Sequence, residues 1–140
     1  MQPGTGASME TAFGTPSSGV SSRNLGYTVR TDTSVNQLYL IKRNGSFNTL
    51  QVTSATFSGG SVYEVVVEWH DGSGIEPEDT IVATAYEYDT ATQTRGAELA
   101  SVSAQDSEFA SNVGIGFIDG SFSNTPTNRY DLYEVLGSVQ

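Results

Sequence analysis

The segment that most constrains the fold of this chain is residues 62–69, Val-Tyr-Glu-Val-Val-Val-Glu-Trp. Its β-branched and aromatic side chains favour the extended backbone of a β-strand. The run of three valines predicts a central position for this strand in its sheet. Trp69 is expected in the core, because it closes the most apolar strand of the chain.

Other segments with strand character follow one another along the chain, separated by turn signals. In residues 25–31, apolar side chains alternate with polar ones at the two-residue period of a half-buried strand. Asn44-Gly45 predicts a hairpin with a type I′ turn. No segment of helical length carries an apolar stripe, so an all-β sandwich or barrel is predicted. The remaining strands are expected at residues 37–43, 47–53, 80–88, 97–103, 112–118 and 130–136.

The chain has 140 residues, which suits one domain. Residues 1–24 are rich in glycine, serine, threonine and proline, and we predict that they form a flexible N-terminal arm or linker. The folded domain is then expected to span residues 25–140. The chain has no cysteine, which excludes disulfides, cysteine-ligated metals and thiol nucleophiles.

Acidic residues outnumber basic ones by 16 to 6, which gives a net charge of −10. Nucleic acid is therefore not an expected partner, since phosphate binding needs clustered lysine and arginine, and an anionic membrane surface is disfavoured for the same reason. Lys42 is the single lysine, and this composition resembles that of proteins from salt-loving organisms, in which salt screens self-repulsion. An ordinary acidic surface that keeps the protein in solution is the alternative.

Two kinds of membrane or targeting segment are not expected in this sequence. No apolar run approaches the roughly 20 residues of a membrane span. Residues 1–19 lack the basic and apolar regions of a signal peptide. If the protein acts outside a cell, we expect another route of export or a leader that has been removed.

Five segments together resemble a known family. They are residues 63–69, Thr-Ile-Val-Ala-Thr-Ala-Tyr at 80–86, Gly-Ala-Glu-Leu-Ala-Ser-Val-Ser at 96–103, Val-Gly-Ile-Gly-Phe at 113–117 and Tyr-Asp-Leu-Tyr-Glu-Val at 130–135. In this order they resemble the C-terminal half of concanavalin A-like, laminin G-like jelly-roll domains, over residues 25–137. The resemblance implies an antiparallel β-sandwich of the jelly-roll type.

The chain departs from this family at its N-terminus. Complete domains of the family have additional opening strands, and residues 1–24 are too short and too polar to supply them. We therefore expect a reduced sandwich, or one that strands from another copy or a partner chain complete. An unpaired sheet edge invites such pairing, so other chains of an assembly are the expected partners, with a homo-oligomer foremost.

The acidic pair that glycan hydrolases of this fold class use is incomplete here. Those enzymes carry Glu-x-Asp-x-Glu or Glu-x-Asp-x-x-Glu, in which two glutamates divide the acid and nucleophile roles. The nearest match is Glu87-Tyr-Asp89-Thr-Ala-Thr92, which lacks the second glutamate. His70 is the only histidine, and without a Gly-x-Ser-x-Gly elbow it is expected to be a turn residue. We predict a non-enzymatic protein with no catalytic residues.

Two kinds of ligand site remain open. Calcium binds carboxylate and carbonyl oxygens, and polar turn chemistry is the alternative role for the same residues. Sugar binding needs an aromatic face with amide or carboxylate groups, although two of the tyrosines suit a core equally well. The calcium candidates are Asp32, Asn36, Asp119 and Asp131; the sugar-binding candidates are Tyr39, Tyr86, Tyr88, Asp119, Phe122, Asn124 and Asn128.

Two functions from different classes follow from these observations. The first is a structural or receptor-contacting component at a virion surface, such as a capsid or tail decoration or an adhesion protein of a halophilic system. Virion parts assemble inside the cell and need no secretion signal. The alternative is a carbohydrate-binding, lectin-like module of a larger secreted or cell-surface protein, with surface glycans as partners.

Overall fold

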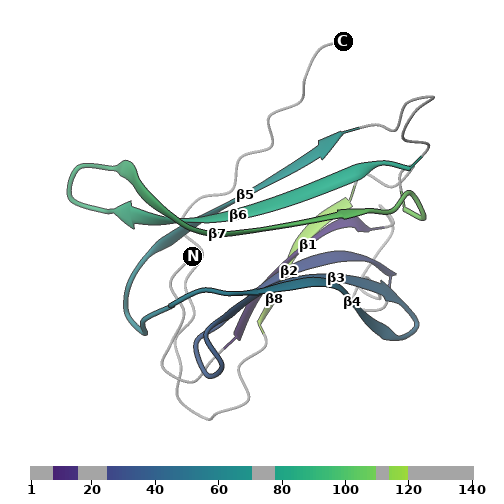
Figure 1. Ribbon diagram of the computed structural model, residues 1–140, viewed down its shortest axis with the longest axis horizontal. Helices are drawn as coiled ribbons and strands as arrows, with labels where there is room; N and C mark the ends of the chain where they lie inside the picture. Colours follow the sequence, from purple (N-terminus) through teal and green to yellow (C-terminus); the bar gives the residue numbers. More distant parts are fainter. Residues whose placement is uncertain (1–7, 16–24, 71–77, 110–113, 120–140) are drawn as a thin grey trace.

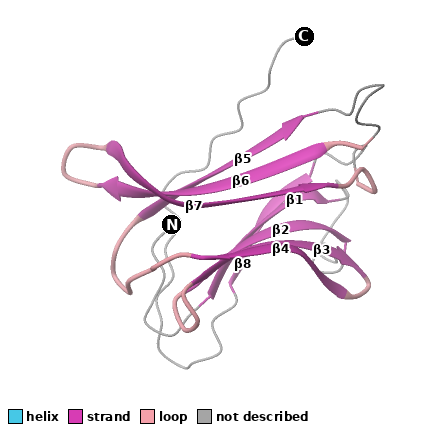
Figure 2. Cartoon of the chain, viewed as in Figure 1, coloured by secondary structure: helices cyan, strands magenta, loops and turns pink. Residues whose placement is uncertain are grey.

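The computed structural model describes residues 8–15, 25–70, 78–109 and 114–119, and these residues form two antiparallel sheets without a helix. Figure 1 shows the sheets as two stacked layers, and Figure 2 shows that short loops join most of the strands. The five-stranded sheet has the order β4-β3-β2-β1-β8, and the three-stranded sheet has the order β5-β6-β7. The strands are β1 (Ser8–Thr15), β2 (Leu25–Asp32), β3 (Gln37–Asn44), β4 (Phe47–Ser54), β5 (Tyr63–His70), β6 (Thr80–Asp89), β7 (Thr94–Gln105) and β8 (Gly114–Asp119). The predicted all-β class is confirmed, and the layers have a sandwich-like arrangement.

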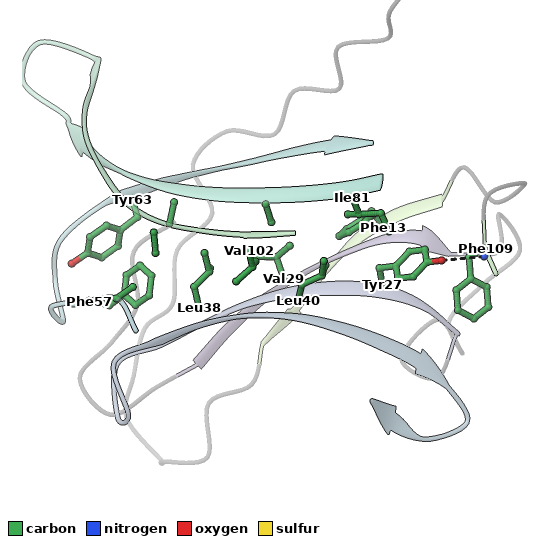
Figure 3. Packing of buried hydrophobic residues seen from close by; sticks show 14 residues of the cluster. Phe13, Tyr27, Val29, Leu38, Leu40, Phe57, Tyr63, Ile81, Val102 and Phe109 are labelled. Atoms are coloured by element: carbon green, nitrogen blue, oxygen red, sulfur yellow. Dashed lines mark hydrogen bonds between the residues drawn. The ribbon is translucent and has the colours of Figure 1, made fainter. Parts of the chain in front are cut away.

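The core lies between the two layers, where the strands direct alternate side chains inward. Phe13, Tyr27 and Phe109 gather at one end of the core, and Phe57 packs on Tyr63 at the other, with ring centroids 5.1 Å apart (Figure 3). Each large side chain that is fully buried contributes roughly 1.5–3 kcal/mol by leaving water. Burial of this apolar face therefore determines which side of each strand faces the other sheet.

Trp69 packs against this core, as the sequence predicted. Its indole ring lies edge-on to Tyr27 with centroids 5.3 Å apart, and to Phe13 at 5.8 Å. The indole Nε1 donates a hydrogen bond of 2.7 Å to Oδ2 of Asp79. The tryptophan thus fills space between the layers and also has a partner for its one polar atom, which a buried indole requires.

The N-terminal segment differs from the prediction. Residues 8–15, expected within a flexible arm, form β1, which lies between β2 and β8 in the five-stranded sheet. The polar composition was misleading because β1 lies between two other strands, and its polar residues Ser8, Glu10 and Thr11 are buried together with Met9 and Phe13. The other positions of residues 1–24 lie outside the described residues.

The position of β5 also differs from the prediction. Among the described strands, β5 pairs only with β6 and so lies at an edge of the three-stranded sheet. Val65 and Val67 face the core, whereas Val66 lies on the other face opposite Thr84. A run of valines indicates that both faces of a strand are apolar, but it carries no information about neighbours in the hydrogen-bonding direction.

The turn after β3 is not of the predicted type. Of the pair Asn44-Gly45, only Gly45 has a positive φ, at 87°. Arg43 and Phe47 are the last paired positions, so three residues lie between them, where a two-residue type I′ turn would leave two. The predicted strand at residues 130–136 lies outside the described residues, as do residues 71–74 of the predicted turn after β5.

No helix in the described part of the chain is long and apolar enough to cross a membrane.

Candidate functional site

The outer face of the five-stranded sheet gathers charged and aromatic side chains from four strands. Directly opposite residues in an antiparallel pair project to the same face. Glu10 of β1 lies opposite Arg30 of β2, which in turn lies opposite Tyr39 of β3. Arg43 lies opposite Phe47, and Tyr39 lies opposite Val52. We call these six residues the outer-face cluster: Glu10, Arg30, Tyr39, Arg43, Phe47 and Val52.

One buried carboxylate serves two arginines in this cluster. The Glu10 side chain is only 2% exposed. Arg30 donates to its Oε1 from Nε at 2.6 Å and also from Nη2. Arg43 donates to its Oε2 from Nη2 at 2.6 Å. A buried carboxylate must be paired, and two guanidiniums against one carboxylate leave this group with a net charge of +1.

The aromatic side chains hold the same two arginines from another side. The guanidinium carbons of Arg30 and Arg43 each lie 4.8 Å from the centre of the Phe47 ring. That of Arg30 also lies 5.9 Å from the centre of the Tyr39 ring. Both distances are within the range of cation–π attraction. The arginine side chains are therefore fixed by hydrogen bonds at one end and by ring contacts over their flat faces.

Apolar surface is exposed at this point. Phe47 and Val52 are 46% and 39% exposed, and they are two of the four large apolar side chains exposed in the described part of the chain. Both belong to β4, which lies at an edge of its sheet among the described strands. The cluster therefore combines a positive centre, aromatic rings and open apolar surface at one sheet edge.

A second polar cluster lies between the layers and joins them. Tyr27 donates from Oη to Oδ1 of Asp106 at 2.5 Å, and Lys42 pairs with Asp106 and, at 3.0 Å, with Glu108. Burial, followed by the hydrogen bond to Asp106, raises the pKa of Tyr27 far above its ordinary value. The hydrogen bond to Asp106 raises the pKa of Lys42 against the opposing effect of burial. Tyr27 is thus neutral and Lys42 charged at ordinary pH, which suits a structural link.

The acid of this second cluster has a lowered pKa. Burial by itself would raise the pKa of Asp106, but hydrogen bonds from Lys42 and Tyr27 outweigh it. The backbone N–H of Glu108 also donates to Asp106, at 3.0 Å. A carboxylate held in this way stays ionised and accepts hydrogen bonds, so we assign the cluster to fold stability.

The outer face of the three-stranded sheet carries a simpler arrangement. Arg95 forms two hydrogen bonds with Glu64, of 2.7 and 2.8 Å, and its guanidinium carbon lies 4.5 Å from the centre of the Tyr86 ring. The hydrogen bonds from Arg95 lower the pKa of Glu64 despite partial burial. Here one arginine faces one carboxylate, so this group is neutral.

The three predicted sugar-binding residues whose side chains are described lie on two different sheets. Tyr39 is in the five-stranded sheet, whereas Tyr86 and Tyr88 are in the three-stranded sheet. Tyr88 is half-buried, and its backbone N–H donates to the carbonyl of Val62 at 3.2 Å. The backbone of Asp119 pairs with Met9, but its side chain and the residues Phe122, Asn124 and Asn128 lie outside the described part of the chain.

The two calcium candidates whose side chains are described, Asp32 and Asn36, serve turns. Asp32 Oδ1 accepts hydrogen bonds from the backbone N–H and the hydroxyl of Ser34, at 2.9 and 2.5 Å. Asn36 has a φ of 54°, and its Oδ1 accepts from the backbone N–H of Phe57 at 3.3 Å. Within the described ranges no group of three or more His, Cys, Asp or Glu side chains could hold a metal ion. Asp131 is outside these ranges, and calcium binding stays a prediction.

Sequence reasoning identified Tyr39 but missed the rest of the outer-face cluster. The alternation of residues 37–43 does place Tyr39 and Arg43 on one face of a strand. Glu10, however, falls within the predicted arm, so the sequence does not indicate the carboxylate that the two arginines share. For Phe47 the sequence predicts only the start of a strand.

Comparisons with protein-family models, curated proteins and solved structures found no match to this chain.

Proposed function

We propose that this chain is a non-enzymatic surface module, a jelly-roll β-sandwich that contacts other protein chains in a virion or another extracellular assembly. The observation that carries the proposal is the exposure of Phe47, which lies beside two arginines, and of Val52 further along the same strand, at an edge of the described sheet. Protein interfaces are enriched in aromatic side chains and arginine, and energetic hot spots favour these types. A sheet edge adds backbone groups that a partner strand can pair with.

The charge of the chain supports a setting of high salt. A net charge of −10 on 140 residues repels itself and repels other copies at low ionic strength. Salt at molar concentration shortens the Debye length to about 3 Å, which removes this barrier to assembly. A virion surface of a halophilic system meets these conditions.

The proposal is tested by the molar mass of the protein in molar salt, measured by light scattering over a range of protein concentrations. We expect a homo-oligomer that dissociates when Phe47 is replaced by serine. Val35, which is 54% exposed in the turn after β2, offers a matched control, and Val35→Ser should leave the mass unchanged. A wild-type monomer at every concentration and salt would contradict the homo-oligomer.

A second candidate function is carbohydrate binding on the same face. It is favoured by Tyr39, whose ring lies beside the Arg30 guanidinium and whose hydroxyl donates to Oε1 of Gln37. An aromatic ring edged by amide and guanidinium groups is what recognition of a sugar requires.

Retention on a column of immobilised glycans tests this candidate. We expect Tyr39→Ala to abolish retention and Tyr86→Ala, on the other sheet, to leave it intact. Equal loss of retention in both variants, or no retention of the wild-type protein, would count against carbohydrate binding on this face. Hydrolysis of a glycan that Glu87→Gln abolishes would contradict both functions.

A further inference from the structure

We propose that Arg30 and Arg43, held over Phe47, form a binding site for a single carboxylate that is attached to an apolar or aromatic group. This site lies on the same surface as the functions proposed above. The experiment measures binding of small probes, so its result does not depend on whether the protein forms an oligomer or is retained by glycans.

The charge of the cluster selects a monoanion. Among the described residues, Glu10 neutralises one of the two guanidiniums, which leaves a charge of +1 on these three side chains in a chain whose net charge is −10. A carboxylate cancels this charge, because it carries −1. A dianion such as sulfate would leave −1 beside the buried Glu10 and within an acidic protein, which is unfavourable in a site of low dielectric.

The cluster has donors that the described residues do not use. A guanidinium has five N–H groups, which are arranged to pair with carboxylates. The Nε of Arg43 is buried and has no hydrogen-bond partner within the described residues. Oγ1 of Thr28 is also buried without a hydrogen-bond partner among these described residues. Thr28 lies two residues after Gly26, which is opposite Arg43, so Thr28 and Arg43 are on the same face of the sheet. Unsatisfied polar atoms of this kind favour a ligand with acceptor oxygens.

The site can be reached and is already ordered. The side chains of Arg30 and Arg43 are 17% and 18% exposed, so part of each meets solvent. Their contacts with Phe47 and Glu10 fix their positions before a ligand arrives, which reduces the entropy lost on binding. The exposed ring of Phe47 and the side chain of Val52 lie where the apolar part of the ligand would pack.

Arg95 on the three-stranded sheet provides a comparison for Arg43 within the same protein. Arg95 lies over Tyr86 much as Arg43 lies over Phe47, but it is paired one-to-one with Glu64. Its guanidinium edge already holds both oxygens of a carboxylate. The two arginines therefore share the cation–π contact and differ in residual charge, and only the Arg30–Arg43 site should bind a carboxylate.

The test measures binding of benzoate, benzamide and sulfate to the wild-type protein at matched ionic strength. Two-dimensional NMR of the arginine Nε–Hε groups reports the site directly. We expect benzoate to shift the Arg43 signal with saturation and to bind about tenfold more tightly than the neutral benzamide, since a charge-assisted hydrogen bond is lost. Equal affinity for benzoate and benzamide, or tighter binding of sulfate than of benzoate, would overturn the proposal without any variant.

Variants then locate the site. Arg43→Gln should weaken benzoate binding about tenfold, whereas Arg95→Gln should leave it unchanged. Glu10→Gln raises the charge of the site to +2, so sulfate should now bind more tightly than it does to the wild-type protein. Loss of benzoate binding in Arg95→Gln equal to that in Arg43→Gln would overturn the assignment. If a variant at a buried position fails to fold, Phe47→Leu, at an exposed position, should still weaken the binding of benzoate more than the binding of sulfate.

Discussion

Tyr27 Oη lies 2.5 Å from Oδ1 of Asp106, and this hydrogen bond joins residues 79 positions apart in the chain. It connects β2 of the five-stranded sheet with the residue that follows β7 of the three-stranded sheet. We predict that Tyr27→Phe lowers the free energy of unfolding by about 1.5–3 kcal/mol, the range for a hydrogen bond to a charged group. Chemical denaturation measures the loss, and Tyr88→Phe, on β6, serves as the control. A change below about 0.5 kcal/mol, the size of an ordinary surface effect, would contradict this role.

The lowered pKa of Asp106 makes stability depend on acid pH. A carboxylate whose folded-state pKa lies below its unfolded value adds stability above the unfolded pKa and loses it as pH falls. The free energy of unfolding should therefore decline below about pH 4, the ordinary pKa of aspartate. Asp106→Asn should reduce the slope of stability against pH between about pH 4 and 2. An unchanged slope in that variant would show that other carboxylates account for the acid sensitivity.

Gly14 is required for two separate reasons. Its φ is +61°, and an added Cβ would lie 2.9 Å from Cη2 of Trp69. Gly60 has a φ of +86° but open space around it, so a substitution at Gly60 tests backbone strain without a steric clash. We predict that Gly60→Ala costs roughly 1–2 kcal/mol from backbone strain and that Gly14→Ala costs about 1–3 kcal/mol more from overpacking. Thermal unfolding of both variants checks the difference, and equal losses would exclude the steric effect.

Glu10 and Glu64 are matched probes of buried and exposed ion pairs. Glu10→Gln leaves two arginines without their shared carboxylate, and we expect a loss of about 2–4 kcal/mol, since the site is mostly buried. Glu64→Gln removes the partner of the half-exposed Arg95 and should cost at most about 1 kcal/mol. Denaturation in molar salt measures both losses. A smaller loss for Glu10→Gln than for Glu64→Gln would contradict the assigned burial.

The acidic surface predicts a response to salt. Screening of the net charge of −10 should raise the free energy of unfolding as sodium chloride increases from low to molar concentration. Refolding yield in the two conditions gives a second measure of the same effect. Insensitivity of both quantities to salt would remove the support for a halophilic origin.

Most strands could be predicted because their signals are local. The predicted ranges 25–31, 37–43 and 47–53 end within one residue of the observed β2, β3 and β4. Strand β7 begins three residues before its predicted start, because Asp89 caps a shorter turn by accepting hydrogen bonds from the backbone N–H groups of Ala91 and Thr92. Turn lengths depend on such side-chain contacts, and composition alone does not reveal them.

The candidate site could not be predicted in the same way. Tyr39 has a recognisable aromatic signal, but its neighbours Arg30 and Glu10 come from strands whose pairing the sequence does not state. The side chain of Glu10 is buried between two arginines, although acidic residues are usually exposed. The pairing of β1 with β2 places Glu10 opposite Arg30, and this pairing comes from the tertiary structure.

The amino-acid sequence by itself determined that this protein is built from strands, because the two-residue alternation of apolar side chains and the turn residues act between near neighbours. It also determined that Tyr27 and Val29 of β2 face inward. The tertiary structure decided that residues 8–15 lie inside a sheet, that β5 lies at an edge among the described strands, and that Arg30 and Arg43 share one carboxylate. These relationships depend on contacts between segments far apart in the chain, and such contacts form only where the path of the whole backbone brings the segments together.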